Sequence, residues 1–347
     1  MKIAIIGLGV AGSYLLNTLS DEHDVTGYEM QKEGGFDAIC AWGASKNEMT
    51  KILSNIDFDF NKYIFFTGKE INLELKGKLR KVPCKGLVTY DKHGLELDLC
   101  RKKNAKYGVR VTPNDFPFDK YDLVIDATSL QRIMLPKINE QLLVPCVEYK
   151  VEYDKLPFDD FYVRPFDTNS GYLWFFPLQN NIGHIGAGDY HRKHNEALES
   201  FMEKYKGKII KKVGRPIRLS APQLCKPFSK GNVVGVGEAI GTVFPLMGEG
   251  IIPSLHCAEM LKENLNDIEA YEQRVLEKFS SYTDIYKIIK LKMDDKISVF
   301  SMLKYSGILW NLYRTMKSEE ERFGLEVRMR DLMAIMLSQR GNWVENL

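Results

Sequence analysis

The sequence predicts a mixed α/β protein with three parts: a parallel sheet covered by helices, an antiparallel sheet, and a helical C-terminal region. Between Lys2 and Glu29 the chain opens with an apolar strand, a glycine-rich turn, a helix and a second strand, which together make one complete βαβ unit. Short alternating strands fill residues 142–230, as is typical of an antiparallel sheet. Residues 266–347 have helical periodicity instead.

Composition excludes several classes of function. The chain has 347 residues, of which 44% are hydrophobic and 27% charged, as in an ordinary globular protein of about two domains. Its 48 Lys and Arg nearly balance 46 Asp and Glu, so charge gives no reason to expect a nucleic-acid partner. Six cysteines without a C-x-x-C pair, and six histidines without ligand spacing beside them, predict neither a metal site nor a disulfide framework.

Membrane insertion is not expected either. Glycines interrupt the first apolar run, which argues against a signal peptide, and no uncharged apolar stretch reaches the length of a membrane span. We expect a cytoplasmic protein with at most peripheral membrane contact. The apolar segment 297–316 favours core or dimer packing over contact with a membrane surface.

The order of these patterns predicts the domain boundaries. Residues 1–141 form the first part of a nucleotide-binding domain, with a small inserted sheet at 50–90. The strand within YDLVIDATS at 121–129 returns to the first sheet. We expect an antiparallel substrate domain at 142–230, a return segment of the nucleotide domain at 231–265 and a helical region at 266–347.

The turn of the first βαβ unit has the spacing of a dinucleotide site. Gly7, Gly9 and Gly12 follow a strand and open a helix, where glycines permit a tight turn and close approach of backbone N–H groups to a pyrophosphate. Glu29 ends the next strand, at the distance from Gly9 where a carboxylate accepts hydrogen bonds from ribose hydroxyls. The order of strand, glycines, helix and acid favours this Rossmann-like reading over a glycine-rich turn without a ligand.

A second glycine-rich segment, GVGEAIGTVFPLMGEGI at 235–251, favours FAD over NAD as the cofactor. It lies too far along the chain to serve the same adenine half, but it can contact the rest of an extended FAD. We expect Glu238 to accept hydrogen bonds from the ribityl or ribose region. The amides from Gly248 to Ile251, at the start of a helix, would face the flavin ring. A loop packed without a ligand is the alternative.

These segments carry a resemblance to a known family. The initial GLGVAG, YDLVIDATS, the 235–251 segment and a central pattern of Tyr172-x-Trp174-x-Phe176-Pro177 followed by Gly186-x-Gly188 resemble the geranylgeranyl reductase family. This family belongs to the p-hydroxybenzoate hydroxylase-like FAD-dependent oxidoreductases. The resemblance implies an FAD-dependent reductase that saturates carbon–carbon double bonds of an isoprenoid or prenyl-lipid substrate. The electron donor, a ferredoxin or NAD(P)H, stays open.

The central pattern predicts an aromatic substrate surface. Tyr172, Trp174 and Phe176 alternate along a strand and so project from one face of its sheet, where they would form an apolar wall for an isoprenoid chain. Three aromatic residues packed in a sandwich core are the alternative. The resemblance also places a Cys-Gly-type segment against the flavin, here read as Cys40-Ala41-Trp42-Gly43, with Cys40 as the proton donor. A buried cysteine acting as a small hydrophobe is the competing interpretation.

The candidate residues fall into three groups. The catalytic candidate is Cys40, and the substrate-binding candidates are Tyr172, Trp174, Phe176 and Trp42. The cofactor-binding candidates are Gly7, Gly9, Gly12, Glu29, Gly43, Ala127, Glu238, Gly248, Glu249, Gly250 and Ile251. No metal ligand is expected. His184, His191 and His194 are each either a proton relay or an ordinary core or surface histidine.

Two further alternatives stay open from the sequence. The same FAD segments occur in flavin-dependent monooxygenases and halogenases acting on aromatic rings, and a flavin-bearing binding protein without turnover would carry them too. The run of seven basic residues between Lys204 and Arg218 contains no acid and is either a solvated face, a docking site for an acidic electron donor, or an attraction for a phosphate headgroup.

Overall fold

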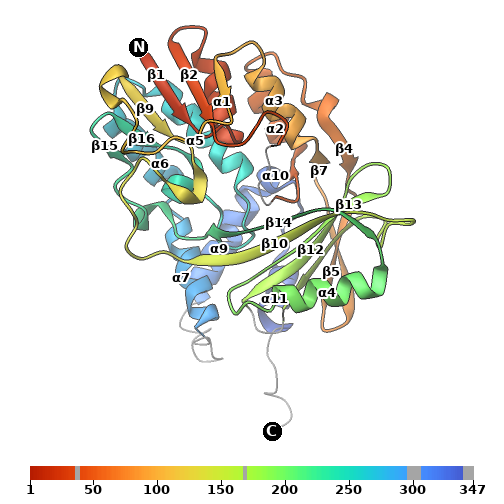
Figure 1. The fold of residues 1–347 in the computed structure, drawn as a ribbon. Coiled ribbons are helices and arrows are strands. Elements are labelled where there is room, and N and C mark those ends of the chain that lie inside the picture. The colour runs from red at the N-terminus through yellow and green to blue at the C-terminus, as the bar shows by residue number, and fades with distance from the viewer. Residues whose placement is uncertain (36–39, 167–169, 295–305, 339–347) are drawn as a thin grey trace. The chain divides into compact units, whose positions relative to one another are not determined.

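The computed structural model describes residues 1–35, 40–166, 170–294 and 306–338, and Figure 1 shows the fold. The chain forms two compact units, each assembled from three stretches of sequence. The first unit comprises residues 1–37, 92–143 and 217–286, and the second comprises residues 38–91, 144–216 and 287–347. The predicted mixed α/β class is confirmed.

The first unit is built on a six-stranded sheet with the order β15-β16-β9-β1-β2-β8. All its strand pairs are parallel except β15 with β16. Ile3, Ala4 and Ile5 of the central strand are fully buried, as expected for a strand covered on both faces. In sheet order the strands are β15 (Ser229–Lys230), β16 (Val233–Gly235), β9 (Leu123–Asp126), β1 (Lys2–Ile6), β2 (Asp24–Glu29) and β8 (Ala105–Tyr107).

Helices pack around this sheet, and α1 contacts both α3 and α5. The hydroxyl of Tyr14 on α1 donates a hydrogen bond of 3.1 Å to Glu259 Oε1 on α5. The α-helices are α1 (Val10–Leu19), α3 (Lys92–Cys100), α5 (Ile251–Glu263), α6 (Ile268–Lys278) and α7 (Tyr282–Met293), the last of which continues into the second unit's sequence. Short 3₁₀ turns are η2 (Phe118–Lys120), η3 (Ser129–Gln131), η4 (Pro222–Leu224) and η5 (Gly237–Ile240).

The second unit contains a seven-stranded sheet with the order β14-β10-β13-β12-β11-β5-β6 and a three-stranded sheet β3-β7-β4. In the larger sheet β11 pairs with β5 in parallel. The pairs β11–β12, β12–β13 and β13–β10 are antiparallel. The larger sheet consists of β14 (Lys208–Arg218), β10 (Leu143–Glu152), β13 (Ile182–Asp189), β12 (Gly171–Pro177), β11 (Phe161–Pro165), β5 (Glu70–Leu75) and β6 (Lys78–Pro83). The smaller one consists of β3 (Gly43–Ser45), β7 (Leu87–Tyr90) and β4 (Ile64–Thr67).

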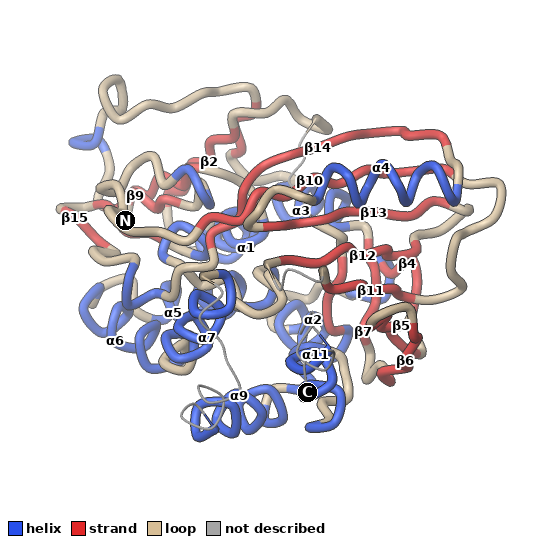
Figure 2. Tube along the Cα trace, turned by 90° about the horizontal axis from the view of Figure 1, so that it is seen from below, coloured by secondary structure: helices blue, strands red, loops and turns tan. Residues whose placement is uncertain are grey.

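One face of the seven-stranded sheet is closed by helix α4 (His194–Tyr205), which lies along β12 and β13 (Figure 2). Leu173 and Phe175 of β12 pack there with Leu198 and Phe201 of α4 in one hydrophobic core. Because side chains alternate along a strand, Tyr172, Trp174 and Phe176 lie on the opposite face. The sheet thus has a core face, which packs against α4, and an aromatic face, which carries Tyr172, Trp174 and Phe176.

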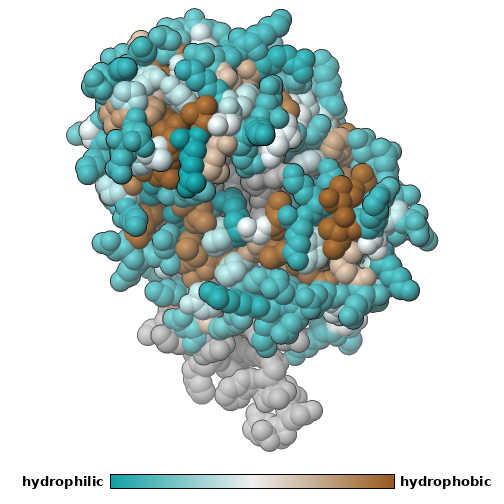
Figure 3. All heavy atoms as spheres, in the orientation of Figure 1, coloured by the Kyte–Doolittle hydropathy of each residue, from teal (hydrophilic) through white to brown (hydrophobic). Residues whose placement is uncertain are grey.

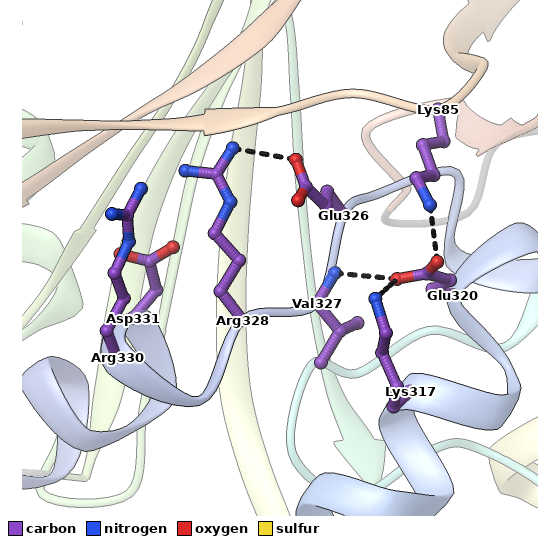
Figure 4. A network of polar contacts seen from close by, with 8 residues as sticks. All are labelled: Lys85, Lys317, Glu320, Glu326, Val327, Arg328, Arg330 and Asp331. Carbon is purple, nitrogen blue, oxygen red and sulfur yellow. Dashed lines mark hydrogen bonds and ion pairs between the residues drawn. The ribbon is translucent and has the colours of Figure 1, made fainter.

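The C-terminal helices of the second unit are held by a polar network (Figure 4). Glu320 accepts hydrogen bonds from Lys85, from Lys317 Nζ at 2.7 Å and from the backbone N–H of Val327 at 3.1 Å. Burial acts to raise the pKa of Glu320, but the hydrogen bonds from Lys317 and Lys85 outweigh it and lower the pKa to about 2. The remaining helices of this unit are α2 (Lys46–Ser54), the 3₁₀ turn η1 (Phe60–Tyr63), α9 (Ser306–Ser318), α10 (Glu320–Phe323) and α11 (Met329–Ser338).

The structure places residues 50–90 in the second unit, because β5 pairs with β11 and thereby extends the sheet expected at 142–230. Residues 297–305 of the apolar segment lie outside the described residues; from Ser306 the segment forms α9, where Leu312 and Met316 are buried and Trp310 is 53% exposed. Among the described residues no helix combines the length and the hydropathy that a bilayer crossing requires. On the face drawn in Figure 3 hydrophilic residues predominate, and hydrophobic ones form separate groups.

The end of β9 depends on one fully buried carboxylate. Asp126 Oδ1 accepts hydrogen bonds from the backbone N–H and the hydroxyl of Thr128, at 3.0 and 2.6 Å. Its Oδ2 accepts from the backbone N–H groups of Met134 and Leu135, at 2.8 and 3.2 Å. The aspartate in YDLVIDATS therefore organises the whole loop that follows the strand.

We expect Asp126→Ala to lower the free energy of unfolding by about 2–4 kcal/mol, because it leaves buried N–H groups without acceptors. Urea denaturation measures the change. Asp115→Ala, which removes an exposed carboxylate bonded to Thr112, is the matched control and should change stability by less than about 0.5 kcal/mol. Equal stabilities of the two variants would contradict the role given to Asp126.

Candidate functional site

The three glycines of the first turn serve different purposes in the first unit. Gly7 has φ +93°, and a Cβ there would lie 2.6 Å from the carbonyl oxygen of Ala127. A Cβ on Gly12 would lie 1.9 Å from the carbonyl oxygen of Gly7, so both positions require glycine for packing. A Cβ on Gly9 would meet no atom within 4 Å. Gly9 therefore faces open space at the start of α1, where unpaired helix N–H groups favour an anion.

Glu29 lies at the end of β2 and is 7% exposed. Its Oε2 accepts the backbone N–H of Leu8 at 3.0 Å, and its Oε1 accepts that of Gln31 at 2.9 Å. Since each carboxylate oxygen accepts more than one hydrogen bond, these contacts fix the side chain and leave capacity for a hydroxyl pair. The position is that expected for a ribose-binding acid.

The segment 235–251 lies beside the first turn, although the two are far apart in sequence. A Cβ on Gly237 would lie 2.9 Å from Ser254 Oγ on α5 and 3.9 Å from the Cβ of Ala11 on α1. Helices α1 and α5 also contact each other directly. The structure thus brings the two glycine-rich segments of the predicted cofactor site together within one unit.

Glu238 is held by protein groups. It is 7% exposed, and its Oε1 accepts the backbone N–H of Arg218 at 2.9 Å, while its Oε2 pairs with the hydroxyl of Ser129. The Arg218 guanidinium donates to the carbonyl oxygens of Glu238 and Leu130, both at 2.7 Å. The carboxylate therefore fastens η5 to the loop after β9, and its contact with a ribityl or ribose group stays a prediction.

The start of α5 is the last part of the predicted cofactor site. Gly248, with φ +65°, Glu249 and Gly250 are partly exposed and lead into the helix at Ile251. The backbone carbonyl of Glu249 accepts the N–H of Phe244 in the preceding loop at 2.8 Å, and its Oε1 accepts the N–H of Ile252 in the first turn of the helix at 3.3 Å. A helix of this length presents N–H groups and a positive dipole end to an anion or an electron-rich ring.

In the second unit the aromatic face is shaped by glycines. Three cross-strand rows run from β12 through β13 to β10: Phe176–His184–Lys150, Trp174–Gly186–Glu148 and Tyr172–Gly188–Cys146. A Cβ on Gly186 would lie 2.2 Å from Cζ2 of Trp174, so the indole lies across this residue. It reaches the next strand, where its Nε1–H donates to Glu148 Oε2 at 3.3 Å. Gly188 leaves corresponding room for Cys146, whose Sγ would be 2.5 Å from a Cβ there.

The segment Cys40–Gly43 lies against the same face. The backbone N–H of Cys40 donates to Glu148 Oε1 at 3.4 Å, and a Cβ on Gly43 would lie 2.5 Å from Cε2 of Phe176. Trp42 has φ +59°, a left-handed conformation that is unfavourable for a large aromatic residue. The second unit thus brings together Cys40, Trp42 and Gly43 with the aromatic residues of β12.

Lys150 and His184 hold the ring of Trp42. The ammonium of Lys150 lies 4.6 Å from the Trp42 ring centroid, and the ring of His184 meets it edge-on at 4.7 Å. Burial chiefly, and then Lys150, lower the pKa of His184 to about 3, against the effect of hydrogen bonds with the backbone of Ala41 and Cys40. The ring is therefore neutral at physiological pH, and its 3.8 Å approach to Glu148 is not an ion pair there.

The other two candidate histidines lie elsewhere. His194 begins α4, which packs against the core face of the sheet, and burial lowers its pKa. His191 is exposed and contacts the ring of Tyr190. Of the three, His184 is the one on the aromatic face.

Glu148 and Lys150 were not predicted from the sequence. They alternate with Cys146 along VPCVEYKVE, and this period of two places all three on one face of β10. Charged residues at alternate strand positions usually face solvent, so the pattern did not distinguish them. Glu148 is in fact only 3% exposed.

Other polar groups of the second unit are less suited to a site. The basic run forms much of β14, an edge strand whose residues 208–212 are all exposed. An open hollow of about 580 Å³ is lined by Tyr313, Lys317, Glu326, Val327, Arg328, Met329 and Arg330, but Lys317 and Arg328 are paired there with carboxylates. Within the described ranges no group of three His, Cys, Asp or Glu side chains is placed to hold a metal ion.

Sequence comparison finds distant relatives. No family model matches the chain. It is 23% identical to an uncharacterized protein of Methanocaldococcus jannaschii, with 90% of this chain and 96% of the relative covered. It is 30% identical over 183 residues to the digeranylgeranylglycerophospholipid reductase of the same organism, covering 45% of this chain and 46% of that enzyme. The chain therefore matches about half the length of the reductase.

Structural comparison establishes the fold over nearly the whole chain. A geranylgeranyl bacteriochlorophyll reductase-like protein from Thermoplasma acidophilum superposes with a TM-score of 0.68 at 14% identity, covering 96% of this chain and 95% of that one. PqsL, a probable FAD-dependent monooxygenase from Pseudomonas aeruginosa, gives 0.62 at 12% identity, with 85% and 97% covered. The flavin-dependent halogenase CmlS gives 0.62 at 15% identity, with 92% and 71% covered. The predicted resemblance and the expected FAD cofactor are supported by these similarities.

We expect Gly186→Ala to destabilise the second unit by about 1–3 kcal/mol, because the new methyl group overlaps the indole of Trp174. Denaturation measures the loss, and the NMR signal of the Trp174 indole N–H should move as the ring leaves Glu148. Gly214→Ala is the matched control, since its Cβ would make only an ordinary 3.6 Å contact with Val147. An unmoved indole signal in Gly186→Ala would refute the packing described here.

The buried neutral His184 predicts acid sensitivity. Its pKa is about 3 in the folded chain against the ordinary 6.5, so the unfolded chain binds the extra proton below pH 6.5 and stability falls as pH falls. From pH 7 to pH 5 this group should remove about 2 kcal/mol from the free energy of unfolding. Urea denaturation at both pH values should show that His184→Gln loses correspondingly less than the parent. Equal losses in His184→Gln and in the parent would contradict the buried neutral state of His184.

Proposed function

We propose that this protein is an FAD-dependent reductase that saturates carbon–carbon double bonds of an isoprenoid chain. The observation that carries the proposal is the aromatic face of the second unit, where Trp174 lies across Gly186 next to the segment of Cys40. The names of the digeranylgeranylglycerophospholipid reductase and the geranylgeranyl bacteriochlorophyll reductase-like protein support this substrate class.

The residues of the first unit fit an extended dinucleotide. The pyrophosphate would bind at Gly9 and the start of α1, the adenine ribose at Glu29, and the flavin end at Gly248 to Ile251. The space at Gly9, where a Cβ would meet no neighbour, is the observation that fits a bound phosphate. When bound and reduced, FAD supplies the hydride that the reaction requires.

Residues of the second unit would bind and orient the substrate. Tyr172 and Phe176 are partly exposed and, with Trp42, would contact the isoprenoid chain, whose burial stabilises the complex by about 0.8 kcal/mol per CH₂. Cys40 would donate the proton to the second carbon of the double bond. Its Sγ accepts the backbone N–H of Trp42 at 3.4 Å, which holds the thiol in a defined position.

A lipid substrate would reach the protein from a membrane, so we include peripheral membrane contact in the proposal. The electron donor would be a ferredoxin or NAD(P)H. Either donor would deliver reducing equivalents to the flavin between turnovers. Separate assays with each donor distinguish the two alternatives.

Anaerobic turnover tests this function. The purified protein should contain FAD or take it up. After reduction with dithionite it should be reoxidised by geranylgeranyl diphosphate or a geranylgeranylated lipid, with a product gain of two hydrogens for each double bond. Cys40→Ser should lower the turnover rate by about 10²-fold, because it removes the general acid. Cys84→Ser is the control, since burial raises the pKa of Cys84 to about 12 and keeps it inert.

Other outcomes would assign the protein to a different class. Consumption of O₂ in proportion to a hydroxylated or halogenated product would identify a monooxygenase or halogenase, as the structural similarity to PqsL and CmlS permits. Tight FAD without substrate-dependent reoxidation would identify a binding protein. Failure to bind FAD would overturn the proposal altogether.

A further inference from the structure

We propose that Glu148 is a positioning residue of the aromatic face, whose carboxyl group holds Trp174 with one oxygen and the segment of Cys40 with the other. The proposal concerns contacts within the second unit, and its catalytic significance rests on the function proposed above. Glu148 belongs to neither the aromatic pattern nor the cysteine segment.

The carboxyl group connects two parts of the chain that are separate in sequence. Oε2 accepts the indole N–H of Trp174 on β12 at 3.3 Å, and Oε1 accepts the backbone N–H of Cys40 at 3.4 Å. Both partners are N–H donors, so Glu148 must offer two acceptor oxygens at once. A single side chain therefore relates the proposed substrate wall to the proposed proton donor.

The surroundings make these contacts specific. Glu148 and His184 are each 3% exposed, so water does not compete freely for their polar atoms. Nδ1 of His184 is buried without a hydrogen-bond partner and lies 3.8 Å from Oε1 of Glu148. The same imidazole bonds to the backbone of Ala41 and Cys40. Two buried side chains, on β10 and β13, thus hold one short segment.

The segment needs such support because its conformation is unfavourable. Trp42, two residues after Cys40, has φ +59°, and a strained backbone of this kind persists only where surrounding contacts enforce it. Loss of the contact at Cys40 should allow the segment to relax. The thiol would then move relative to Trp174, and a displacement of about 1 Å is enough to lower a rate about 10²-fold.

Glu148→Gln tests the two hydrogen bonds of the carboxyl group while it keeps the size of the side chain. The amide has nearly the same shape but only one acceptor oxygen, so it must present its NH₂ group to one of the two N–H donors. We expect kcat for the reductase reaction to fall about 10²-fold. KM should change much less than kcat, since Glu148 is buried and Tyr172, Phe176 and Trp42 keep their apolar side chains. FAD should still bind, because the cofactor candidates on α1, β2 and α5 belong to the first unit, and kcat is therefore compared at saturating FAD, since Gly43 in the loosened segment is itself a cofactor candidate.

Two readouts do not depend on activity. The indole N–H signal of Trp174, assigned with Trp174→Phe, should shift and exchange faster with solvent in Glu148→Gln. Alkylation of Cys40 by iodoacetamide, followed by peptide mass, should become faster as the segment loosens. Burial raises the pKa of Cys84 to about 12, and those of Cys100, Cys225 and Cys257 to about 11, which limits their competing reaction.

The chain offers a matched control on the same strand. Glu152 lies four residues after Glu148 on β10 and therefore on the same face of the strand. Its side chain, however, is 54% exposed and pairs with Lys208 at 3.7 Å. Glu152→Gln should leave kcat, the indole signal and the alkylation rate as in the parent protein. If Glu148→Gln behaves like Glu152→Gln in all three, Glu148 is not a positioning residue.

A double-mutant cycle covers the case in which Glu148→Gln folds poorly. Trp174→Phe removes the indole N–H, so the effects of Glu148→Asp on kcat and on Cys40 alkylation should be smaller in the Trp174→Phe background than in the parent. Additive effects would refute the coupling. If the parent reduces no isoprenoid substrate but Glu148→Gln still moves the indole and cysteine readouts, the positioning holds and the proposed function fails.

Discussion

The aromatic face depends on one steric relation, the contact of the Trp174 indole with the backbone of Gly186. A Cβ at that position would lie 2.2 Å from the ring, so glycine alone allows the indole to cross β13 and meet Glu148 on β10. The position of Glu148 then determines where Cys40 can be held. The absence of a side chain at Gly186 on β13 thus determines how Trp174 of β12, Glu148 of β10 and the segment of Cys40 are arranged.

The first unit uses the same device for a different purpose. Gly7 and Gly12 allow the turn after β1 to approach α1 and the loop after β9 so closely that any side chain would overlap a carbonyl group. Gly9, between them, faces open space. Two of the three glycines therefore maintain the turn, and the third leaves room for a ligand. The regular spacing of the motif conceals this division of roles.

Local patterns were sufficient to predict much of the fold. The βαβ unit that opens the chain, the strand in YDLVIDATS and the alternation of Tyr172, Trp174 and Phe176 all follow from short-range periodicity, which the backbone geometry of helices and strands imposes. A family resemblance placed the segment Cys40–Gly43 against the flavin, and its contact with the aromatic strand emerged only from the structure. Periodicity alone does not report contacts between distant segments.

What the sequence did not predict depends on three-dimensional register. Glu148 and Lys150 resemble ordinary outward-facing residues of a strand, and only the pairing of β10 with β13 places them beside Gly186 and His184. His184 was one of three equivalent candidates until the sheet assigned it to the aromatic face. The position of residues 50–90 likewise followed from a single pairing, that of β5 with β11. Such long-range pairings are determined by the total packing of the sheet.

The interleaving of the two units in sequence has a consequence for biosynthesis. In the first sheet Ile3 pairs with Leu123, and Val124 pairs in turn with Val233, so its central strands come from widely separated parts of the chain. A ribosome releases these strands in the order β1, β9 and β16, so the nascent β1 can pair with β2 on one side while β9, its partner on the other side, is still untranslated. The first sheet thus closes only late in translation, and until β9 is made one edge of KIAII stays unpaired, which is the kind of edge at which nascent chains aggregate.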